Sequence, residues 1–119
     1  MLIADDNEDA GETLAMMLRM LGHEVRTATN GQDAISQCEV FQPALVCLDL
    51  GMPVLDGLGA ARAMRQHPWG RRALLVAMTG CGQEEDRRKT QDAGFDIHLV
   101  KPVDPMEIIR LLGSLDRDD

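Results

Sequence analysis

The chain alternates strand-like and helix-like segments five times, and this alternation constrains its fold more than any other feature. Most of the strand-like segments are short apolar runs, and four of the five helix-like segments space apolar residues three or four apart. Such alternation predicts an α/β fold with a parallel sheet, right-handed crossovers and helices on both faces. The expected strands are Leu2–Ala4, His23–Ala28, Ala44–Leu48, Ala73–Met78 and Ile97–Val100, and five helices are expected to follow them.

The character of the strands predicts their order in the sheet. Ala44–Leu48 and Ala73–Met78 are continuously apolar, as strands buried on both faces must be, so we expect them at the centre. His23–Ala28 carries charge and alternates only weakly, which is typical of an edge strand. These features favour a doubly wound sheet of order 2-1-3-4-5, in which ligands bind at the carboxyl ends of the strands.

Three of the expected helices make predictions about packing. The helix that turns Leu58, Ala61 and Met64 inward is expected to run to His67–Pro68. The segment 83–92 is uninterrupted polar sequence, so a helix there is expected to bury almost nothing and to be the least protected from hydrogen exchange. The last helix is expected to begin with Asp104 as N-cap and Pro105 as first residue. Its inward residues are expected to be Met106, Ile109, Leu112 and Leu115.

The composition excludes several classes of function. Twelve basic against twenty acidic residues give a net charge of −8, which argues against direct binding to nucleic acid or to an anionic membrane. No apolar run approaches the ~20 residues that span a bilayer, so we expect a cytoplasmic protein without membrane insertion. Cys38, Cys47 and Cys81 lack metal-ligand spacing and are expected to be reduced thiols.

Chemically useful side chains stand at the ends of four of the five expected strands. Asp5 and Asp6 follow the first strand, Asp49 ends the third, Thr79 the fourth and Lys101 the fifth. Each has a plainer explanation alone, since acids in loops are often only solvated and an Asp after a strand often caps a helix. Because these strand ends meet at one edge of a parallel sheet, we expect the five side chains to converge there.

The charges at this edge predict a metal ion. Asp5, Asp6 and Asp49 would repel one another, and their pKa values should rise unless a cation lies among them. Oxygen ligands at an open site suit Mg²⁺, which keeps several waters. Three carboxylates, Lys101 and a divalent cation balance to zero formal charge, and such a site can receive a phosphoryl group.

Four motifs lie at the positions where one known family carries them. They are Asp5–Asp6, then Asp49–Leu50–Gly51–Met52–Pro53 with Asp56–Gly57, then Thr79–Gly80, then Lys101–Pro102. Together they resemble the receiver domain of two-component response regulators, whose fold is flavodoxin-like. The resemblance covers essentially the whole chain, so residues 1–119 are expected to form one receiver domain.

The resemblance implies how a phosphoryl group would be handled. Asp49 would be the phosphoacceptor, attacking the phosphorus of a phosphohistidine on a histidine kinase or a histidine phosphotransfer protein. Thr79 would hydrogen-bond the new phosphoryl oxygens and Lys101 would pair with them, next to a cis Lys101–Pro102 bond. The domain would then be no turnover enzyme, because it would catalyse only its own phosphorylation and dephosphorylation.

The resemblance also implies a metal set and a switch. The metal set would be Asp5, Asp6, Asp49 and Gly51, in which Asp6 would bind Mg²⁺ directly, Asp5 mainly through water and Gly51 through its backbone carbonyl. Phosphorylation would draw Thr79 inward and change the face made by the polar helix 83–92, strand 97–100 and the last helix. A downstream effector domain or protein would read that change.

Two features depart from the family's usual pattern. Where the family usually has Tyr or Phe, three residues before the lysine, this chain has His98. One interpretation makes His98 a half-exposed histidine with no special role, and the other makes it fill the place of the switch aromatic. The first strand begins at residue 2, which is consistent with a domain cut from a longer polypeptide. The stretch from Phe95 to Pro102 looks most like receivers attached to hybrid sensor kinases.

Three alternatives are open to test. A phosphatase with an Asp nucleophile would carry a second carboxylate two residues on, where Gly51 stands. A nucleotide-binding module would carry a complete glycine-rich loop, and neither Gly57–Gly59 nor Gly80–Gly82 is completed. A receiver-like scaffold that signals by protein binding alone would be expected to lack part of the set Asp6, Asp49 and Lys101, and none is missing.

Overall fold

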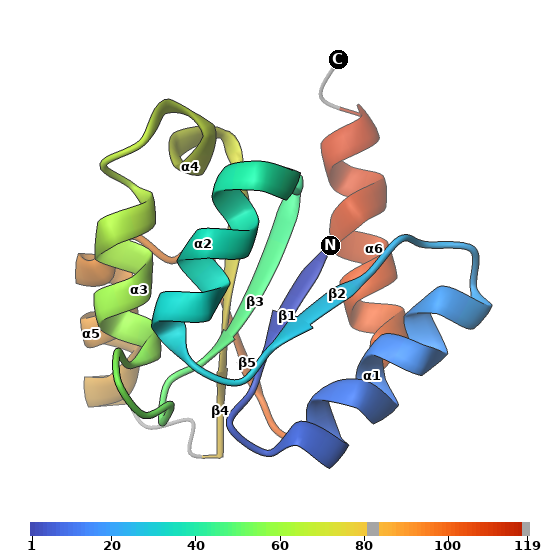
Figure 1. Cartoon of the computed structure of the whole chain (residues 1–119), viewed down its shortest axis with the longest axis horizontal. Coiled ribbons are helices and arrows are strands. Elements are labelled where there is room, and N and C mark those ends of the chain that lie inside the picture. Colours follow the sequence, from blue (N-terminus) through green and yellow to red (C-terminus); the bar gives the residue numbers. More distant parts are fainter. Residues whose placement is uncertain (81–83, 118–119) are drawn as a thin grey trace.

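The computed structural model describes residues 1–80 and 84–117, and it contains a parallel sheet between two layers of helices (Figure 1). The strand order is β2-β1-β3-β4-β5, as predicted. The strands are β1 Leu2–Ala4, β2 Arg26–Ala28, β3 Leu45–Asp49, β4 Leu74–Thr79 and β5 Ile97–Val100. The helices are α1 Glu8–Met20, α2 Gly31–Phe41, α3 Gly57–Met64, α4 Pro68–Arg72, α5 Glu84–Ala93 and α6 Pro105–Arg117.

The burial of the strands follows their place in the sheet. β1 and β3 are buried along their whole length, and β4 along all but its first residue, because helices cover both faces of these inner strands. β2 lies at one edge and exposes Arg26, which confirms the edge assignment made from its charge. The ends of β1 and β3, where the strand order reverses, are therefore held between packed layers.

The helices form one apolar core on each face of the sheet. α1 and α6 cover one face, where Leu14, Leu18 and Ile108 pack against the strands (Figure 1). α2, α3 and α5 cover the other face, where Ile35 and Met64 pack against the strands. Each such side chain stabilises the fold by roughly 1.5–3 kcal/mol when it is fully buried.

Among the described residues, four helices begin with side-chain caps, and one of them is α6, where Asp104 Oδ1 accepts a hydrogen bond from the Met106 N–H at 2.9 Å and confirms the predicted N-cap. The Asn7 side chain accepts a hydrogen bond from the Ala10 N–H at 3.1 Å, and Asn30 accepts one from Asp33 at 2.8 Å. Asp56 accepts one from the Gly59 N–H at 2.8 Å, which gives this motif residue a structural role. Each cap satisfies an N–H group that has no partner inside its own helix.

The helix that turns Leu58, Ala61 and Met64 inward was predicted to run to His67–Pro68, and that predicted end is wrong. α3 stops at Met64, and a separate short helix, α4, begins at Pro68 and brings the helices in the described chain to six rather than five. The Arg65 guanidinium donates to the carbonyls of Gly70 and Ala73 at 2.8 and 2.9 Å, so the chain folds back at this point. α4 packs so closely that a Cβ on Gly70 would lie 1.7 Å from the Met64 oxygen.

Two packing predictions are also corrected. α5 was expected to bury almost nothing, yet Thr90 and Ala93 on its inner side are each only 2% exposed. In α6, Met106 was expected to face inward but is 47% exposed, and Ile108 is buried in its place. α6 therefore presents a different stripe from the predicted one, although Ile109 and Leu112 do pack against the core. The side chains of Leu115 and Gln83 are not among those that the structure describes.

Cys38 and Cys47 are free and buried, in agreement with the prediction of reduced thiols in core segments. Burial raises the pKa of both thiols to about 12, so they stay protonated and unreactive at neutral pH. Cys81 lies outside the described residues. None of the helices described is long and apolar enough to cross a membrane.

Candidate functional site

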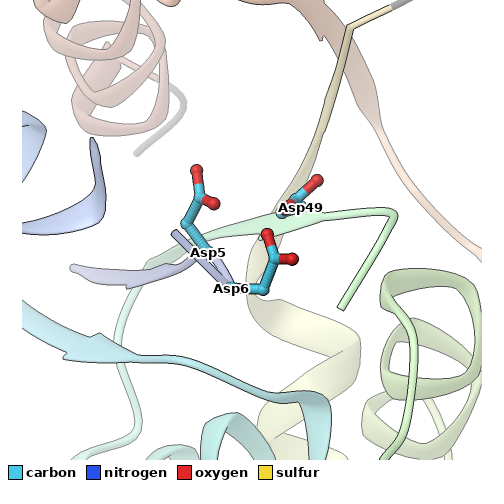
Figure 2. Close-up of side chains that lie close together, drawn as sticks. All are labelled: Asp5, Asp6 and Asp49. Carbon is cyan, nitrogen blue, oxygen red and sulfur yellow. The ribbon is translucent and has the colours of Figure 1, made fainter. Parts of the chain in front are cut away.

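Three carboxylates meet at the carboxyl ends of β1 and β3 (Figure 2). One oxygen from each of Asp5, Asp6 and Asp49 lies within 4.8 Å of the others. The parallel register places Ala4 beside Leu48, so Asp5 and Asp49 leave their strands side by side. Asp5 and Asp49 are buried, with 4% and 7% of their surface exposed, whereas Asp6 is exposed.

Lys101 joins this cluster from the end of β5. Its Nζ lies 3.1 Å from Asp5 Oδ2 and 3.3 Å from Asp49 Oδ1. Its backbone N–H donates to the carbonyl of Thr79 at 2.7 Å, and Thr79 is itself buried at the end of β4. The peptide bond between Lys101 and Pro102 is cis, as the resemblance implied. All five side chains predicted from the strand ends are thus found at one edge of the sheet.

Backbone groups orient the two buried carboxylates. The Asn7 N–H donates to Asp5 Oδ1 at 2.9 Å, and the Gly51 N–H donates to Asp49 Oδ1 at 3.2 Å. A Cβ on Gly57 would lie 2.5 Å from the backbone oxygen of Asp49, so a glycine lets α3 begin directly against the end of β3. The sequence analysis missed Asn7, although an Asn just before a helix is a recognisable N-cap signal.

The carboxylates of Asp6 and Asp49 have opposite pKa shifts. Interaction with the Asp49 side chain, together with some burial and the charges of Asp49 and Asp5, raises the pKa of Asp6. Burial alone would raise the pKa of Asp49, but hydrogen bonds with Asp6 and the Gly51 N–H and the charge of Lys101 outweigh it and lower that pKa. The expected rise in pKa therefore holds for Asp6 and not for Asp49, because hydrogen bonds with Asp6 and the Gly51 N–H, together with the nearby Lys101 ammonium, stabilise the charged form of Asp49.

The ammonium group of Lys101 offsets the negative charge of Asp5 and Asp49. Burial alone would lower the pKa of Lys101, but hydrogen bonds and charge interactions with Asp5 and Asp49 raise it. The lysine is thus protonated and Asp49 is ionised at neutral pH. An ionised, oriented carboxylate beside an ammonium group can act as a nucleophile towards an anionic group whose charge the ammonium offsets.

The donor set fits a magnesium ion. Asp5, Asp6 and Asp49 offer only oxygen ligands, and Asp6 lies at the solvent side, which suits a cation that keeps several of its waters. Asp5 already uses one oxygen for Lys101 and the other for the Asn7 N–H. That division leaves Asp6 and Asp49 as the carboxylates with the most capacity for direct ligation.

A cavity of about 630 Å³ opens beside the cluster, between α1 and the loop that follows β5. Its lining includes Asp5 and Lys101 together with Met17, Pro102 and Val103. Two of the charged residues at this edge of the sheet therefore border an open space.

The remaining predicted residues lie near this edge without joining the carboxylate cluster. Gly51 is exposed in the loop after β3, where only its N–H is seen to contact Asp49. His98 lies on β5 opposite Ala77 of β4, on the sheet face that α5 covers, and its Nδ1 lies 3.3 Å from Thr90 Oγ1. Thr90 was not singled out in the sequence, because a threonine in a wholly polar segment carries no signal of burial.

Residues 1–112 match the response regulator receiver domain family, and the chain therefore belongs to that family. The fold, the strand order and the acidic edge of the sheet agree with this assignment. Residues 1–112 accordingly form a receiver domain of two-component signalling.

Its relatives include an uncharacterized 14.6 kDa protein in the sodA1 3' region of Leptolyngbya boryana, 38% identical over 93% of this chain and 85% of that protein. The transcriptional regulatory protein SrrA of Staphylococcus aureus is 31% identical over 96% of this chain and 46% of its own length. The chain thus spans about half the length of such regulators.

One solved structure that resembles this chain holds a metal ion. It is the receiver domain of sensor histidine kinase PA1611 from Pseudomonas aeruginosa PAO1, with a magnesium ion coordinated in its active-site cleft. The two chains are 32% identical, with a TM-score of 0.84 over 93% of this chain and 91% of that one. A likeness to sensor kinase receivers, expected from the sequence, is therefore found among the structural neighbours.

Proposed function

We propose that this domain accepts a phosphoryl group on Asp49, in a magnesium-dependent step of a phosphorelay. The observation that carries the proposal is the state of Asp49, which is buried, held ionised and placed 3.3 Å from the Lys101 ammonium. Its neighbours Asp5 and Asp6 complete an oxygen donor set at the same edge. The receiver domain with bound magnesium supports the same chemistry by analogy.

In the transfer step, an Asp49 oxygen attacks the phosphorus of a phosphohistidine. The new O–P bond forms as the P–N bond breaks, and the electron pair of that bond stays on the leaving imidazole nitrogen. Lys101 offsets charge on the phosphoryl oxygens, and Thr79, at the end of β4, donates its hydroxyl to one of them. The Gly51 N–H keeps the acceptor carboxylate in place during attack.

The metal set in this proposal is Asp5, Asp6, Asp49 and the backbone carbonyl of Gly51. Magnesium, when bound, would neutralise phosphoryl charge and relieve the repulsion among the carboxylates. Asp6 and Asp49 would be direct ligands, whereas Asp5, occupied by Lys101 and the Asn7 N–H, would act mainly through water.

A partner would recognise the phosphorylated state at the β5 edge of the sheet, on the surface formed by α5, β5 and α6. Thr79 and Lys101 lie at the ends of adjacent strands and are joined by a backbone hydrogen bond, so a movement of either residue would displace the end of β5. Thr79 and His98 are the proposed switch residues on this route.

The proposed partners follow from the chemistry and from the relatives. The donor would be a histidine kinase or a histidine phosphotransfer protein, because a phosphohistidine suits a carboxylate acceptor. The output would be an effector domain or protein, as the matched regulators are about twice the length of this chain. A cytoplasmic location and the absence of direct contact with nucleic acid or membrane belong to the same proposal, with the acidic charge of the domain as support.

The test is phosphorylation by a small donor. The purified domain is incubated with acetyl phosphate, with and without Mg²⁺, and its intact mass is measured. One phosphoryl group should add to the unchanged protein with Mg²⁺, and none to Asp49→Asn. Asp9→Asn is the matched control, because Asp9 is an exposed acid on the first turn of α1.

Full labelling of Asp49→Asn would overturn the assignment of the acceptor. No labelling of the unchanged domain, at any Mg²⁺ concentration, would instead favour the scaffold that signals without phosphorylation. Continuous release of inorganic phosphate at many turnovers per domain would point to a phosphatase.

A further inference from the structure

Thr90 is a buried hydroxyl on the most polar helix of the molecule. It is 2% exposed, although its helical neighbours Lys89 and Gln91 are exposed. Its Oγ1 lies 2.8 Å from the carbonyl oxygen of Arg87, one turn earlier, and 3.3 Å from His98 Nδ1 on β5. These contacts make Thr90 a polar link between α5 and the sheet.

The two hydrogen-bond contacts of Thr90 Oγ1 indicate which ring nitrogen of His98 carries the proton. A carbonyl oxygen only accepts, so the single hydroxyl proton of Thr90 is donated to Arg87 over the shorter distance. Thr90 Oγ1 can then contact His98 only as an acceptor, which requires a proton on His98 Nδ1. A neutral His98 is therefore in the Nδ1–H form, with a bare lone pair on Nε2.

The Nε2 atom of His98 is an unsatisfied acceptor in the position that the ring has in this structure. Nε2 is closed to solvent and has no hydrogen-bond partner among the residues that the structure describes. A cavity of about 290 Å³ adjoins the ring and is lined by Arg87, Gln91 and Asp96 among others. Turning the ring towards this cavity would offer Nε2 a donor or water, at the expense of the bond to Thr90. The present position of the ring thus satisfies Nδ1, and a turned ring would satisfy Nε2 instead.

We propose that Thr90 is a positioning residue that holds His98 in the Nδ1–H form and ties α5 to β5 in the unphosphorylated domain, and that phosphorylation of Asp49 releases this tie. The second half rests on the proposed function. The route is short, because Lys101 pairs with Asp49, its N–H bonds to Thr79, and His98 lies three residues before it on β5. The buried hydroxyl and the unsatisfied Nε2 are independent observations that point to the same pair.

The resting state is tested by ¹⁵N NMR of the histidine rings in mildly alkaline buffer, where free imidazole is neutral. His98→Phe identifies the His98 signals. The unchanged domain and Thr90→Ser should show the Nδ1–H form for His98, since serine keeps the hydroxyl. Thr90→Val keeps the shape and removes the acceptor, so at least half of the Nδ1–H population should move to the Nε2–H form.

A residue that only filled space would leave the ring protonation unchanged in Thr90→Val. An Nε2–H ring in the unchanged domain, or the same ring form in the valine and serine variants, would overturn the tie. Loss of folding in Thr90→Val would leave the ring form of the unchanged domain and of Thr90→Ser to decide the question.

The release is tested with beryllofluoride and Mg²⁺, which mimic the phosphoryl group. Mimic bound at Asp49 should convert His98 away from the Nδ1–H form and speed hydrogen exchange of α5 at least threefold; an unchanged ring and helix would overturn the release. Failure of beryllofluoride to bind would overturn the proposed function and the release together, while the resting ring form would still decide the tie.

Discussion

The acidic edge and the α5 side of this domain are built in different ways, although one strand, β5, belongs to both. Asp5 follows β1 and Asp49 ends β3, and both of these inner strands are covered on both faces. Both side chains are buried, and backbone N–H groups orient them. α5 is a polar helix whose buried side chains include the small residues Thr90 and Ala93. The residues proposed to take part in phosphoryl transfer are thus held by dense packing, and the helix proposed to report on that step is held by fewer contacts.

The contrast should be largest in stability after truncation of a core side chain. Leu75→Ala, at a fully buried position of β4, should lower the free energy of unfolding by roughly 2–5 kcal/mol, because it leaves a cavity between the helical layers. Urea denaturation measures this loss. Leu21→Ala at the exposed end of α1 is the matched control and should change little. A Leu75→Ala loss below about 1 kcal/mol would mean that the central strands are not the rigid part.

A second effect concerns the charge partner of the acidic edge. Lys101→Ala removes the ammonium that offsets charge at Asp49, so the rate of labelling by acetyl phosphate with Mg²⁺ should fall on the order of 10²-fold. Lys89→Ala, which removes an exposed lysine of α5, should label at the normal rate. Equal rates in both variants would show that Lys101 takes no part in transfer.

Hydrogen exchange compares the two regions directly. After correction for intrinsic rates, amides in the middle of α5 should exchange at least about tenfold faster than those of α1, which is anchored by Leu14, Ala15 and Leu18. Thr90→Val should widen the difference by removing the link to His98. Equal protection of the two helices would show that the few buried contacts of α5 suffice to hold it.

The smallest effect is expected at Asp6. Its pKa is raised in the folded domain, so stability should fall as the pH rises through that pKa and Asp6 ionises beside Asp49. Asp6→Asn should therefore stabilise the metal-free domain at neutral pH, by less than about 1 kcal/mol for so exposed a group, and the gain should vanish in acid. Thermal unfolding across pH measures it.

The matched variant Asp9→Asn should have the opposite sign, because Asp9 lies in the first turn of α1 and favours that helix end. Mg²⁺ should stabilise the unchanged domain more than it stabilises the Asp6→Asn variant. A neutral-pH loss of stability in metal-free Asp6→Asn would contradict the repulsion inferred at this edge.

Much of the fold and of the site could be predicted from the sequence because it depends on local patterns. Continuous apolar runs predicted β3 and β4 as inner strands, and charge on His23–Ala28 predicted the edge, since burial on both faces admits no charge. The chain order of polar residues at strand ends then sufficed to bring Asp5, Asp49 and Lys101 together. Parallel topology makes this inference possible, because it sends all carboxyl ends to one edge.

Only the tertiary structure decided the features that depend on which neighbour fills a space. Arg65 reaches the carbonyls of Gly70 and Ala73 and ends α3 early, a contact that no periodicity encodes. The same holds for the burial of Ile108 in place of Met106 and for the pairing of Thr90 with His98. The opposite pKa shifts of Asp6 and Asp49 arise from the groups that surround each carboxylate, since Asp6 interacts mainly with Asp49, whereas Asp49 has hydrogen bonds with Asp6 and the Gly51 N–H and lies beside Lys101. Electrostatic and packing energies vary steeply over a few ångströms, whereas sequence patterns specify only the face and the strand on which a residue lies.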